Sequence, residues 1–414
     1  MLTMQEIGQN AVKAERIMAT ARGGLKDAAL NEVAAALRNN CEKIIKANKI
    51  DLKNGKAAGL TPSLLDRLSL DAGRIEAMAD GVEKIAAMDD PVGRILSGSS
   101  RPNGLKIQKV SVPLGVIAVI YEARPNVSVD AAALCLKAGN AVILRGGKEA
   151  IHSNKALAAI MRAAVKSAGL PEDCVQLVED TARESANELM KMNRYIDVLI
   201  PRGGAGLIKA AMENSTIPVI ETGVGNCHVY VDSAADIDMA ANIIFNAKTS
   251  RPSVCNACES ILVHKDIAEL ALLAIHAALA EKSVEIRGDE MVCAILPGAV
   301  PAAESDWGTE YLDYIVSAKV VADIDEAIEH IAAYGTKHSE CIITGDYAAA
   351  QKFLNSVDAA AVYVNASTRF TDGGEFGFGA EIGISTQKLH ARGPLGLNNL
   401  TSEKYMVYGT GQIR

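Results

Sequence analysis

The chain has 414 residues, 49% of them apolar and only 4% aromatic, so two lobes with cores of mainly Ala, Val, Ile and Leu are expected. The formal net charge of −8 argues against a nucleic-acid partner, because a phosphate backbone attracts positive charge. No apolar run reaches the roughly 18 residues of a membrane-spanning helix, and the start of the chain lacks a signal-peptide pattern, so we expect a cytoplasmic protein with no membrane partner.

Helical spacing dominates residues 3 to about 95. Leu30, Val33, Leu37, Cys41 and Ile44 recur at intervals that place them on one apolar stripe. Residues 98–112 then change to an extended pattern around a turn, which predicts a hairpin arm. The tail LTSEKYMVYG alternates in the same way, and we expect it to pair with that arm.

From residue 116 onward, short apolar strands alternate with helices. Repeated βαβ units at this spacing predict a parallel sheet with helices on both faces, an architecture that binds dinucleotides. In the first lobe, strands are predicted at 116–121, 141–145, 174–178, 197–201 and 218–222, with helices at 129–138, 154–168, 182–192 and 205–212. In the second lobe, strands are predicted at 228–232, 259–264, 294–297, 315–321, 340–345 and 360–365, with helices at 237–249, 267–281, 323–334 and 346–356.

Two glycine-rich turns are candidates for a phosphate site. Gly203 and Gly204 follow a strand and precede a helix, where backbone amides can bind a phosphate. A tight turn that needs small residues explains them equally well. Arg145, followed by Gly146 and Gly147, ends another strand and is either a bidentate phosphate ligand or a surface charge.

The segment RPSVCNACES, residues 251–260, contains two of the eight cysteines, Cys255 and Cys258. Cysteines of a reducing compartment are thiols by default. A C-x-x-C pair is a redox couple, half of a metal site, or a nucleophile beside a packing residue. No second pair or histidine cluster completes a metal site, so no metal is expected. Periodicity does not choose between the other two interpretations.

Longer blocks add a family resemblance. VPLGVIAVIYEARPNV, ETGVGNC and SVCNA resemble the oxyanion-site, glutamate and nucleophile segments of aldehyde dehydrogenases. The blocks YEARPNVSVDA, LRGGKEAIHSN, AKTSRPSVCNA and GAEIGISTQKLHARGPLGL resemble more specifically the gamma-glutamyl phosphate reductases, a family of that superfamily, from about residue 5 to the C-terminus.

The resemblance implies an α/β, aldehyde dehydrogenase-like fold with two Rossmann-like lobes and a small β arm. Residues 1–97 and 113–225 would form the dinucleotide-binding domain, and residues 226–392 the catalytic domain. Residues 98–112 and 393–414 would form the oligomerisation arm of a homodimer or homotetramer.

The activity that the resemblance implies is NADPH-dependent reduction of L-glutamyl 5-phosphate to L-glutamate 5-semialdehyde and phosphate, the second step of proline biosynthesis from glutamate. Cys255 would hold the substrate as a thioester, with Asn126 in the oxyanion hole. A nearby cation or a helix N-terminus should lower the pKa of this thiol, and Lys248 and Arg251 are the candidate cations. Cys258 departs from the family, where an apolar residue is expected, and is assigned to packing. Transient contact with glutamate 5-kinase would protect the unstable acyl phosphate.

Cofactor residues also follow from the resemblance. Arg145 takes the place of a lysine that meets the adenosine ribose, beside Gly146 and Gly147, and suits the 2′-phosphate of NADPH or NADP+. Gly203 and Gly204 would face the pyrophosphate. Ser305 stands where the family places the acid that holds the nicotinamide ribose, so Glu304 and Glu310 are the substitutes.

The amino-acid head of the substrate needs its own ligands. Arg124, Glu375, His390 and Arg392 lie in matching blocks and are expected to bind it. Glu221 stands where hydrolysing aldehyde dehydrogenases keep the glutamate that activates water. A reductase has no use for activated water, so Glu221 is expected only to line the substrate site.

Overall fold

The structure is a computed structural model that describes residues 2–414, apart from the side chain of Ser63. Its contacts divide the chain into two compact units. Unit 1 comprises Met1–Thr222, Gly377–Gly383 and Leu395–Arg414, and unit 2 comprises Gly223–Phe376 and Ile384–Pro394.

Unit 1 begins with five helices. They are α1 (Met4–Met18), α2 (Gly23–Asn39), α3 (Cys41–Ala57), α4 (Pro62–Leu68) and α5 (Ala72–Ala87). A capping box between Thr3 and Glu6 starts α1. The predicted stripe is buried at Leu30, Val33, Leu37 and Ile44. Cys41 is only half-buried, because α2 ends at Asn39 and Cys41 opens a new helix.

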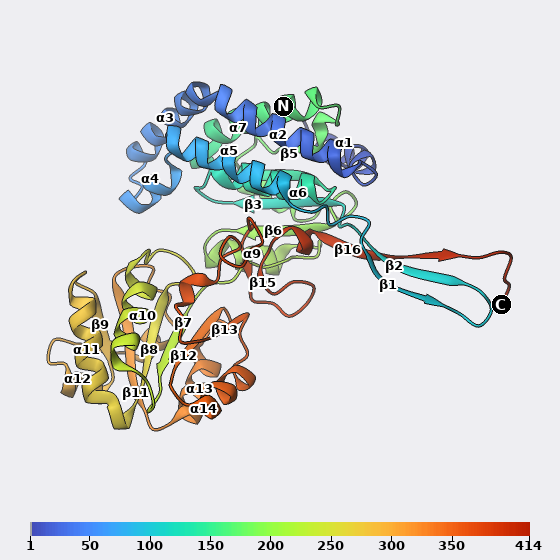
Figure 1. Ribbon diagram of the computed structural model, residues 1–414. Helices are drawn as coiled ribbons and strands as arrows, with labels where there is room; N and C mark the ends of the chain where they lie inside the picture. The colour runs from blue at the N-terminus through green and yellow to red at the C-terminus, as the bar shows by residue number, and fades with distance from the viewer. Residues whose placement is uncertain (1) are drawn as a thin grey trace. The chain divides into compact units, whose positions relative to one another are not determined.

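A four-stranded parallel sheet forms the centre of unit 1, in the order β5-β4-β3-β6. Its strands are β3 (Val116–Tyr121), β4 (Ala141–Gly146), β5 (Val175–Leu177) and β6 (Val198–Arg202), and its helices are α6 (Asn126–Lys137), α7 (Ile151–Ser167), α8 (Arg183–Leu189) and α9 (Ala205–Asn214). Figure 1 shows α1, α2, α5, α6 and α7 gathered over this sheet. The strand predicted at 218–222 is reduced to one bridge between Leu199 and Val219.

An antiparallel arm completes unit 1. It is built from β1 (Ile95–Ser100), β2 (Lys106–Pro113) and β16 (Thr401–Tyr408), in the order β1-β2-β16. The register runs from Thr401 opposite Pro113 to Tyr408 opposite Lys106, which confirms the predicted pairing of the tail with the arm. Figure 1 shows the three strands reaching away from the helices of unit 1.

Unit 2 contains a seven-stranded parallel sheet in the order β10-β9-β11-β8-β7-β12-β13. Its strands are β7 (Cys227–Val231), β8 (Cys258–His264), β9 (Glu285–Gly288), β10 (Val300–Pro301), β11 (Ile315–Val321), β12 (Ser339–Ile343) and β13 (Ala361–Val364). Its helices are α10 (Ile237–Thr249), α11 (Ala268–Ala280), α12 (Glu290–Ile295), α13 (Ile324–Tyr334) and α14 (Tyr347–Ser356).

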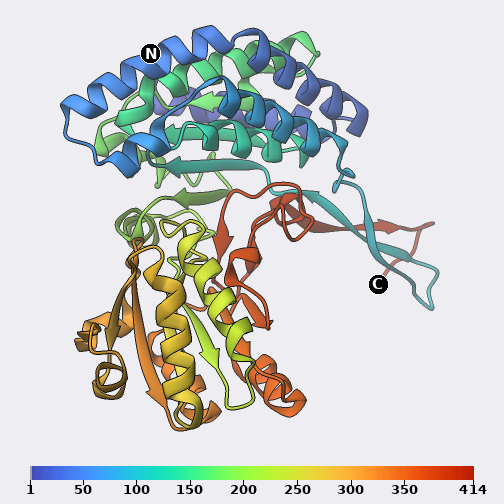
Figure 2. The ribbon, with the colours of Figure 1, turned by 60° about the vertical axis from the view of Figure 1, so that its left-hand side comes forward.

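Strand alternation puts different helices on the two faces of this sheet. Val229 and Val231 of β7 belong to a core with α10 and α11, which run side by side in Figure 2. Tyr230, between them, belongs to a second core with α13 and α14. Both faces are therefore buried, as a parallel sheet requires.

The strand predicted at 294–297 is wrong. Those residues begin inside α12, which starts after Asp289, whose side chain accepts a hydrogen bond from the Val292 amide. A short apolar run does not distinguish helix from strand, and here the N-cap decides. None of the helices in residues 2–414 has the length and apolar character needed to cross a membrane.

Candidate active site

The loop between α10 and β8 presents one accessible thiol. Cys255 is half-buried on this loop, whereas Cys258, at the first position of β8, is completely buried. Burial raises the pKa of the Cys258 thiol to about 12, against the opposing effect of the Lys248 ammonium. A thiol held protonated is a poor nucleophile, so the geometry favours packing for Cys258 and chemistry for Cys255.

Gly225 gives the Cys255 loop its position. A Cβ atom at Gly225 would lie only 1.4 Å from the carbonyl oxygen of Cys255, so no larger residue fits there. The thiol of Cys227 donates to the same carbonyl oxygen, with sulfur and oxygen 3.2 Å apart. The Gly225 amide donates to Glu310 Oε1 at 2.8 Å, which places that carboxylate against the segment supporting Cys255.

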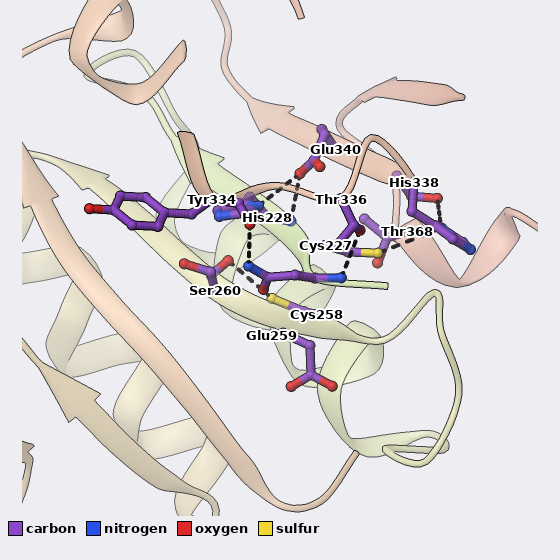
Figure 3. Close-up of polar contacts among 12 residues, drawn as sticks. Cys227, His228, Cys258, Glu259, Ser260, Tyr334, Thr336, His338, Glu340 and Thr368 are labelled. Atoms are coloured by element: carbon purple, nitrogen blue, oxygen red, sulfur yellow. Dashed lines mark hydrogen bonds and ion pairs between the residues drawn. The ribbon is translucent and has the colours of Figure 1, made fainter. Parts of the chain in front are cut away.

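A buried polar cluster continues behind this support (Figure 3). The sulfur of Cys227 lies 3.7 Å from His338 Nδ1, and His338 Nδ1 lies 2.8 Å from Ser339 Oγ. His228 follows Cys227 in β7, and its amide donates to Glu340 Oε2 at 2.7 Å. Burial raises the pKa of Cys227 well above its usual value, so this thiol supports the loop in its protonated form.

Asn256, next to the candidate nucleophile, is clamped by the 3-10 turn η5 (Thr368–Phe370). Its Nδ2 donates to the carbonyl oxygens of Arg369 at 3.2 Å and Thr371 at 3.0 Å. The Thr368 hydroxyl donates to the Asn256 carbonyl oxygen at 2.8 Å, and the Arg369 guanidinium donates to Asn256 Oδ1. Segments more than a hundred residues apart therefore hold the loop in one conformation.

Of the two cations predicted to act on the Cys255 thiol, Lys248 already has a carboxylate partner. Lys248 is completely buried and pairs with the equally buried Glu259 at 2.6 Å, so its charge is already balanced. Burial raises the pKa of Glu259, and Lys248 opposes that shift. Arg251 is exposed on the loop itself. Arg369, which sequence reasoning missed, also carries a guanidinium to the loop.

The predicted oxyanion and substrate residues at the start of the first lobe lie in unit 1. Asn126 is the first residue of α6, and its Nδ2 donates to Asp130 Oδ2 at 3.0 Å. Arg124 lies half-buried in the turn that joins β3 to this helix, and Glu221 lies half-buried just before the end of unit 1. Cys255 belongs to unit 2.

The predicted cofactor residues form two turns at the carboxyl ends of β4 and β6, the two strands on either side of β3 in unit 1. Arg145 donates to the carbonyl oxygens of Thr181 and Ala182 at 2.9 and 3.0 Å, and burial lowers its pKa. Its Nε is buried without a hydrogen-bond partner among the described residues. An added Cβ atom would lie 2.1 Å from Asn154 Nδ2 at Gly146 and 2.0 Å from Glu149 Oε1 at Gly147, so a side chain at either position would have to displace the end of one of these side chains.

A carboxylate occupies the second turn. The Gly204 amide, directly before α9, donates to Glu122 Oε2 at 2.9 Å, and a Cβ at Gly203 would lie 2.5 Å from the same oxygen. Amides at a helix start favour negative charge, which Glu122 supplies here.

The remaining predicted substrate residues, Glu375, His390 and Arg392, belong to unit 2. Arg392 pairs with Asp358 at 2.9 Å, and its Nε and Nη2 are buried with no partner among the described residues. Glu375 is exposed in the turn that follows Asp372, and His390 is exposed with a positive φ of 68°.

The two acids expected at the nicotinamide ribose have different partners. Glu304 accepts a hydrogen bond from the Tyr334 hydroxyl, and Ser305 lies in the 3-10 turn Glu304–Gly308. Glu310 alone contacts the segment that supports Cys255. Among residues 2–414, no group of three or more His, Cys, Asp or Glu side chains is arranged to hold a metal ion.

Comparisons with known proteins identify relatives that share this architecture. Residues 3–294 match the model of the aldehyde dehydrogenase family. The chain is 60% identical over 407 residues to a gamma-glutamyl phosphate reductase of Clostridium botulinum, covering 98% of each chain. It is 58% identical to that of Lachnospira eligens, with 100% of both chains covered. A crystal structure of the Thermotoga maritima gamma-glutamyl phosphate reductase superposes with a TM-score of 0.96 at 48% identity, covering 99% of each chain.

Proposed function

Because the chain belongs to the aldehyde dehydrogenase family and, within it, to the gamma-glutamyl phosphate reductases, we propose that it is an oxidoreductase that reduces L-glutamyl 5-phosphate to L-glutamate 5-semialdehyde and phosphate. This reaction would be the second step of proline biosynthesis from glutamate. The observation that carries the proposal is the half-buried Cys255, held on a clamped loop while the thiols around it are buried.

The chemistry begins with the Cys255 thiolate. It attacks the acyl carbon of the substrate, a carbon–sulfur bond forms, and the carbon–oxygen bond to phosphate breaks. Asn126 and the Cys255 amide are the proposed donors to the oxyanion of the tetrahedral intermediate. The resulting thioester must accept a hydride before water reaches it, so Glu221 lines the substrate site without activating water.

NADPH is the proposed cofactor, and it would supply the hydride when bound. The residues present fit it: Arg145 has a desolvated guanidinium with an unpartnered Nε, suited to a 2′-phosphate. Gly146 and Gly147 keep the same turn free of side chains. Gly203 and Gly204 precede a helix start, where a pyrophosphate would replace the Glu122 carboxylate that the Gly204 amide binds. Glu310 is the proposed ligand of the nicotinamide ribose.

The substrate head is assigned to Arg124, Glu375, His390 and Arg392. Of these, Arg392 offers the clearest support, because two of its guanidinium nitrogens are buried without a partner among the described residues. We further propose a cytoplasmic homodimer or homotetramer that contacts glutamate 5-kinase transiently, since direct transfer would protect the acyl phosphate from hydrolysis.

The test is an assay of purified protein for phosphate-dependent reduction of NADP+ by glutamate 5-semialdehyde, the reverse reaction. Cys255→Ala should abolish turnover, because no thioester can form. Cys258→Ala, a matched control three residues away, should retain most of it. Equal loss in both variants would favour a dithiol redox protein, and turnover of other aldehydes without this activity would contradict the proposed substrate.

A further inference from the structure

Arg369 bridges the two ends of the loop that carries Cys255. Its Nε donates to Ser250 Oγ at 3.1 Å, and its Nη1 donates to Asn256 Oδ1. The guanidinium is therefore held by both ends of a loop that has Cys255 between them. Arg251, the residue after Ser250, adds a second guanidinium from the loop itself.

These two arginines differ in their partners from Arg287 and Lys248, two other cations of unit 2. Arg287 lies 2.8 Å from Asp306, and Lys248 lies 2.6 Å from Glu259. Neither Arg251 nor Arg369 has a carboxylate within ion-pair distance among the described residues. Asp372 is the acid that acts on Arg369, but its Oδ1 accepts the amides of Gly374 and Glu375 at 2.8 and 3.3 Å.

The environment of Arg369 favours an anion. A guanidinium has five N–H donors, and the two hydrogen bonds of Arg369 leave three for a ligand or solvent. Burial lowers the pKa of Arg369, and repulsion by Arg251 lowers it further, while the negative charge that Cys255 can carry acts in the opposite direction. An anion between the two guanidiniums would offset both the desolvation and the repulsion.

We propose that Arg369 and Arg251 bind the phosphoryl group of the acyl phosphate beside Cys255, and inorganic phosphate when the reaction runs in reverse. This inference rests on the proposed function and names the residues that receive its leaving group. Planar guanidinium donors match the oxygens of a phosphate, which a lysine does not.

The same pair acts throughout the acyl transfer. Before attack, the two cations stabilise the Cys255 thiolate. As the sulfur–carbon bond forms, the electron pair of the breaking carbon–oxygen bond leaves with phosphate, and the negative charge moves from sulfur to that oxygen. In reverse, a phosphate oxygen attacks the thioester carbon and sulfur departs as thiolate. Cations that contact both sites stabilise the charge along this path.

The first experiment needs no substrate. The rate at which iodoacetamide alkylates Cys255, followed by mass spectrometry of its peptide, is measured against increasing inorganic phosphate. Phosphate should protect the wild-type thiol saturably. Arg251→Gln should need about tenfold more phosphate for the same protection, as expected for the loss of one charge-assisted contact. Lys282→Gln, which removes a charge from an exposed residue of unit 2, should behave like the wild type.

The second experiment uses the reverse reaction. Arg251→Gln and Arg369→Lys should each raise the KM for phosphate about tenfold while the KM for NADP+ stays unchanged. Arg251→Gln decides the matter if Arg369→Lys fails to fold, since the Arg251 side chain has no hydrogen bond to another described residue.

Different experimental results would overturn the phosphate site and the proposed substrate. Wild-type protein that is not protected by phosphate, or Arg251→Gln that is protected like wild type, would overturn the phosphate site. A wild-type enzyme that does not oxidise glutamate 5-semialdehyde, but whose thiol is protected by phosphate in an Arg251-dependent way, would overturn only the proposed substrate.

Discussion

At the scale of single residues, Gly225 determines where the nucleophile lies. A side chain at this position would overlap the backbone of Cys255, with a Cβ 1.4 Å from its carbonyl oxygen and 2.7 Å from its Cα. Backbone atoms cannot move aside as the end of a flexible side chain can. Gly225→Ala must therefore displace the loop that carries the thiol.

We predict that Gly225→Ala lowers kcat of the reverse reaction by about 100-fold, because a misplacement of about 1 Å at a reacting centre has a cost of that size. Circular dichroism should show a folded protein. Gly298→Ala is the matched control, since no atom lies within 4 Å of its added Cβ. Unchanged kcat in Gly225→Ala would mean that the loop tolerates displacement.

The sequence alone did not identify which cation acts on the Cys255 thiol. Lys248 is close to Cys255 in sequence, which made it a candidate for lowering the thiol pKa. The structure pairs it with Glu259, four residues beyond Cys255 and also buried. Arg369 could not be found from spacing, because the fold joins it to Asn256 across 113 residues. The signal was an arginine in a Ser/Thr-rich turn directly after a predicted strand.

At the scale of elements, helix α13 carries a buried histidine with no hydrogen-bond partner among the described residues. His330 is 4% exposed, and both of its ring nitrogens are buried and unpartnered. Its ring packs against Trp307 at 5.7 Å, Tyr334 at 4.7 Å and His228 at 5.6 Å between centroids. Burial, followed by repulsion from His228 and Lys319, lowers the pKa of His330 to about 3.

This histidine links stability to pH. Between pH 6.5 and about 3, the unfolded chain binds a proton that folded His330 does not, so its contribution to stability is complete above pH 6.5 and is lost as the pH falls. His330→Phe should raise the thermal midpoint at pH 7 by about 1–3 °C, since an unpartnered buried polar ring costs about 1–3 kcal/mol. It should also reduce the fall in midpoint between pH 7 and pH 5.

Thermal unfolding of both proteins at pH 7, 6 and 5 tests this prediction. His152→Gln, which removes an exposed histidine, is the control and should follow the wild type. A wild-type pH dependence that persists in His330→Phe would assign the acid sensitivity to other groups.

At the scale of the whole molecule, the parts of the fold that repeat were predictable. Alternation of strands and helices is a property of neighbouring residues, so periodicity identified both parallel sheets and most of their strands. Strand β10 at the edge of the second sheet and its neighbour β9 were missed, since they have two and four residues and carry little pattern. The site combines Gly225, the Cys255 loop and η5. These three segments are distant in sequence and meet only in the folded unit 2, so local periodicity does not predict their contacts.

The antiparallel arm of β1, β2 and β16 offers a surface for the proposed assembly. Strand β16 is an edge of its three-stranded sheet, and it exposes Tyr405, Val407 and Tyr408 at 66%, 56% and 52%. An exposed apolar edge strand invites pairing with another chain, which agrees with the proposed homodimer or homotetramer. Burying these side chains in a partner would remove their apolar surface from water.

We predict that Tyr405→Glu combined with Val407→Glu yields particles with the 43.6 kDa mass of one chain, whereas the wild-type mass is a multiple of it. Carboxylates at these positions would have to be desolvated in an interface, and that cost opposes assembly. Light scattering coupled to size-exclusion chromatography gives the masses. Lys53→Glu, on an exposed part of α3, changes the net charge by the same −2 and should leave assembly intact. A wild-type chain of 43.6 kDa would contradict the assembly, and an assembled double variant would move the interface away from β16.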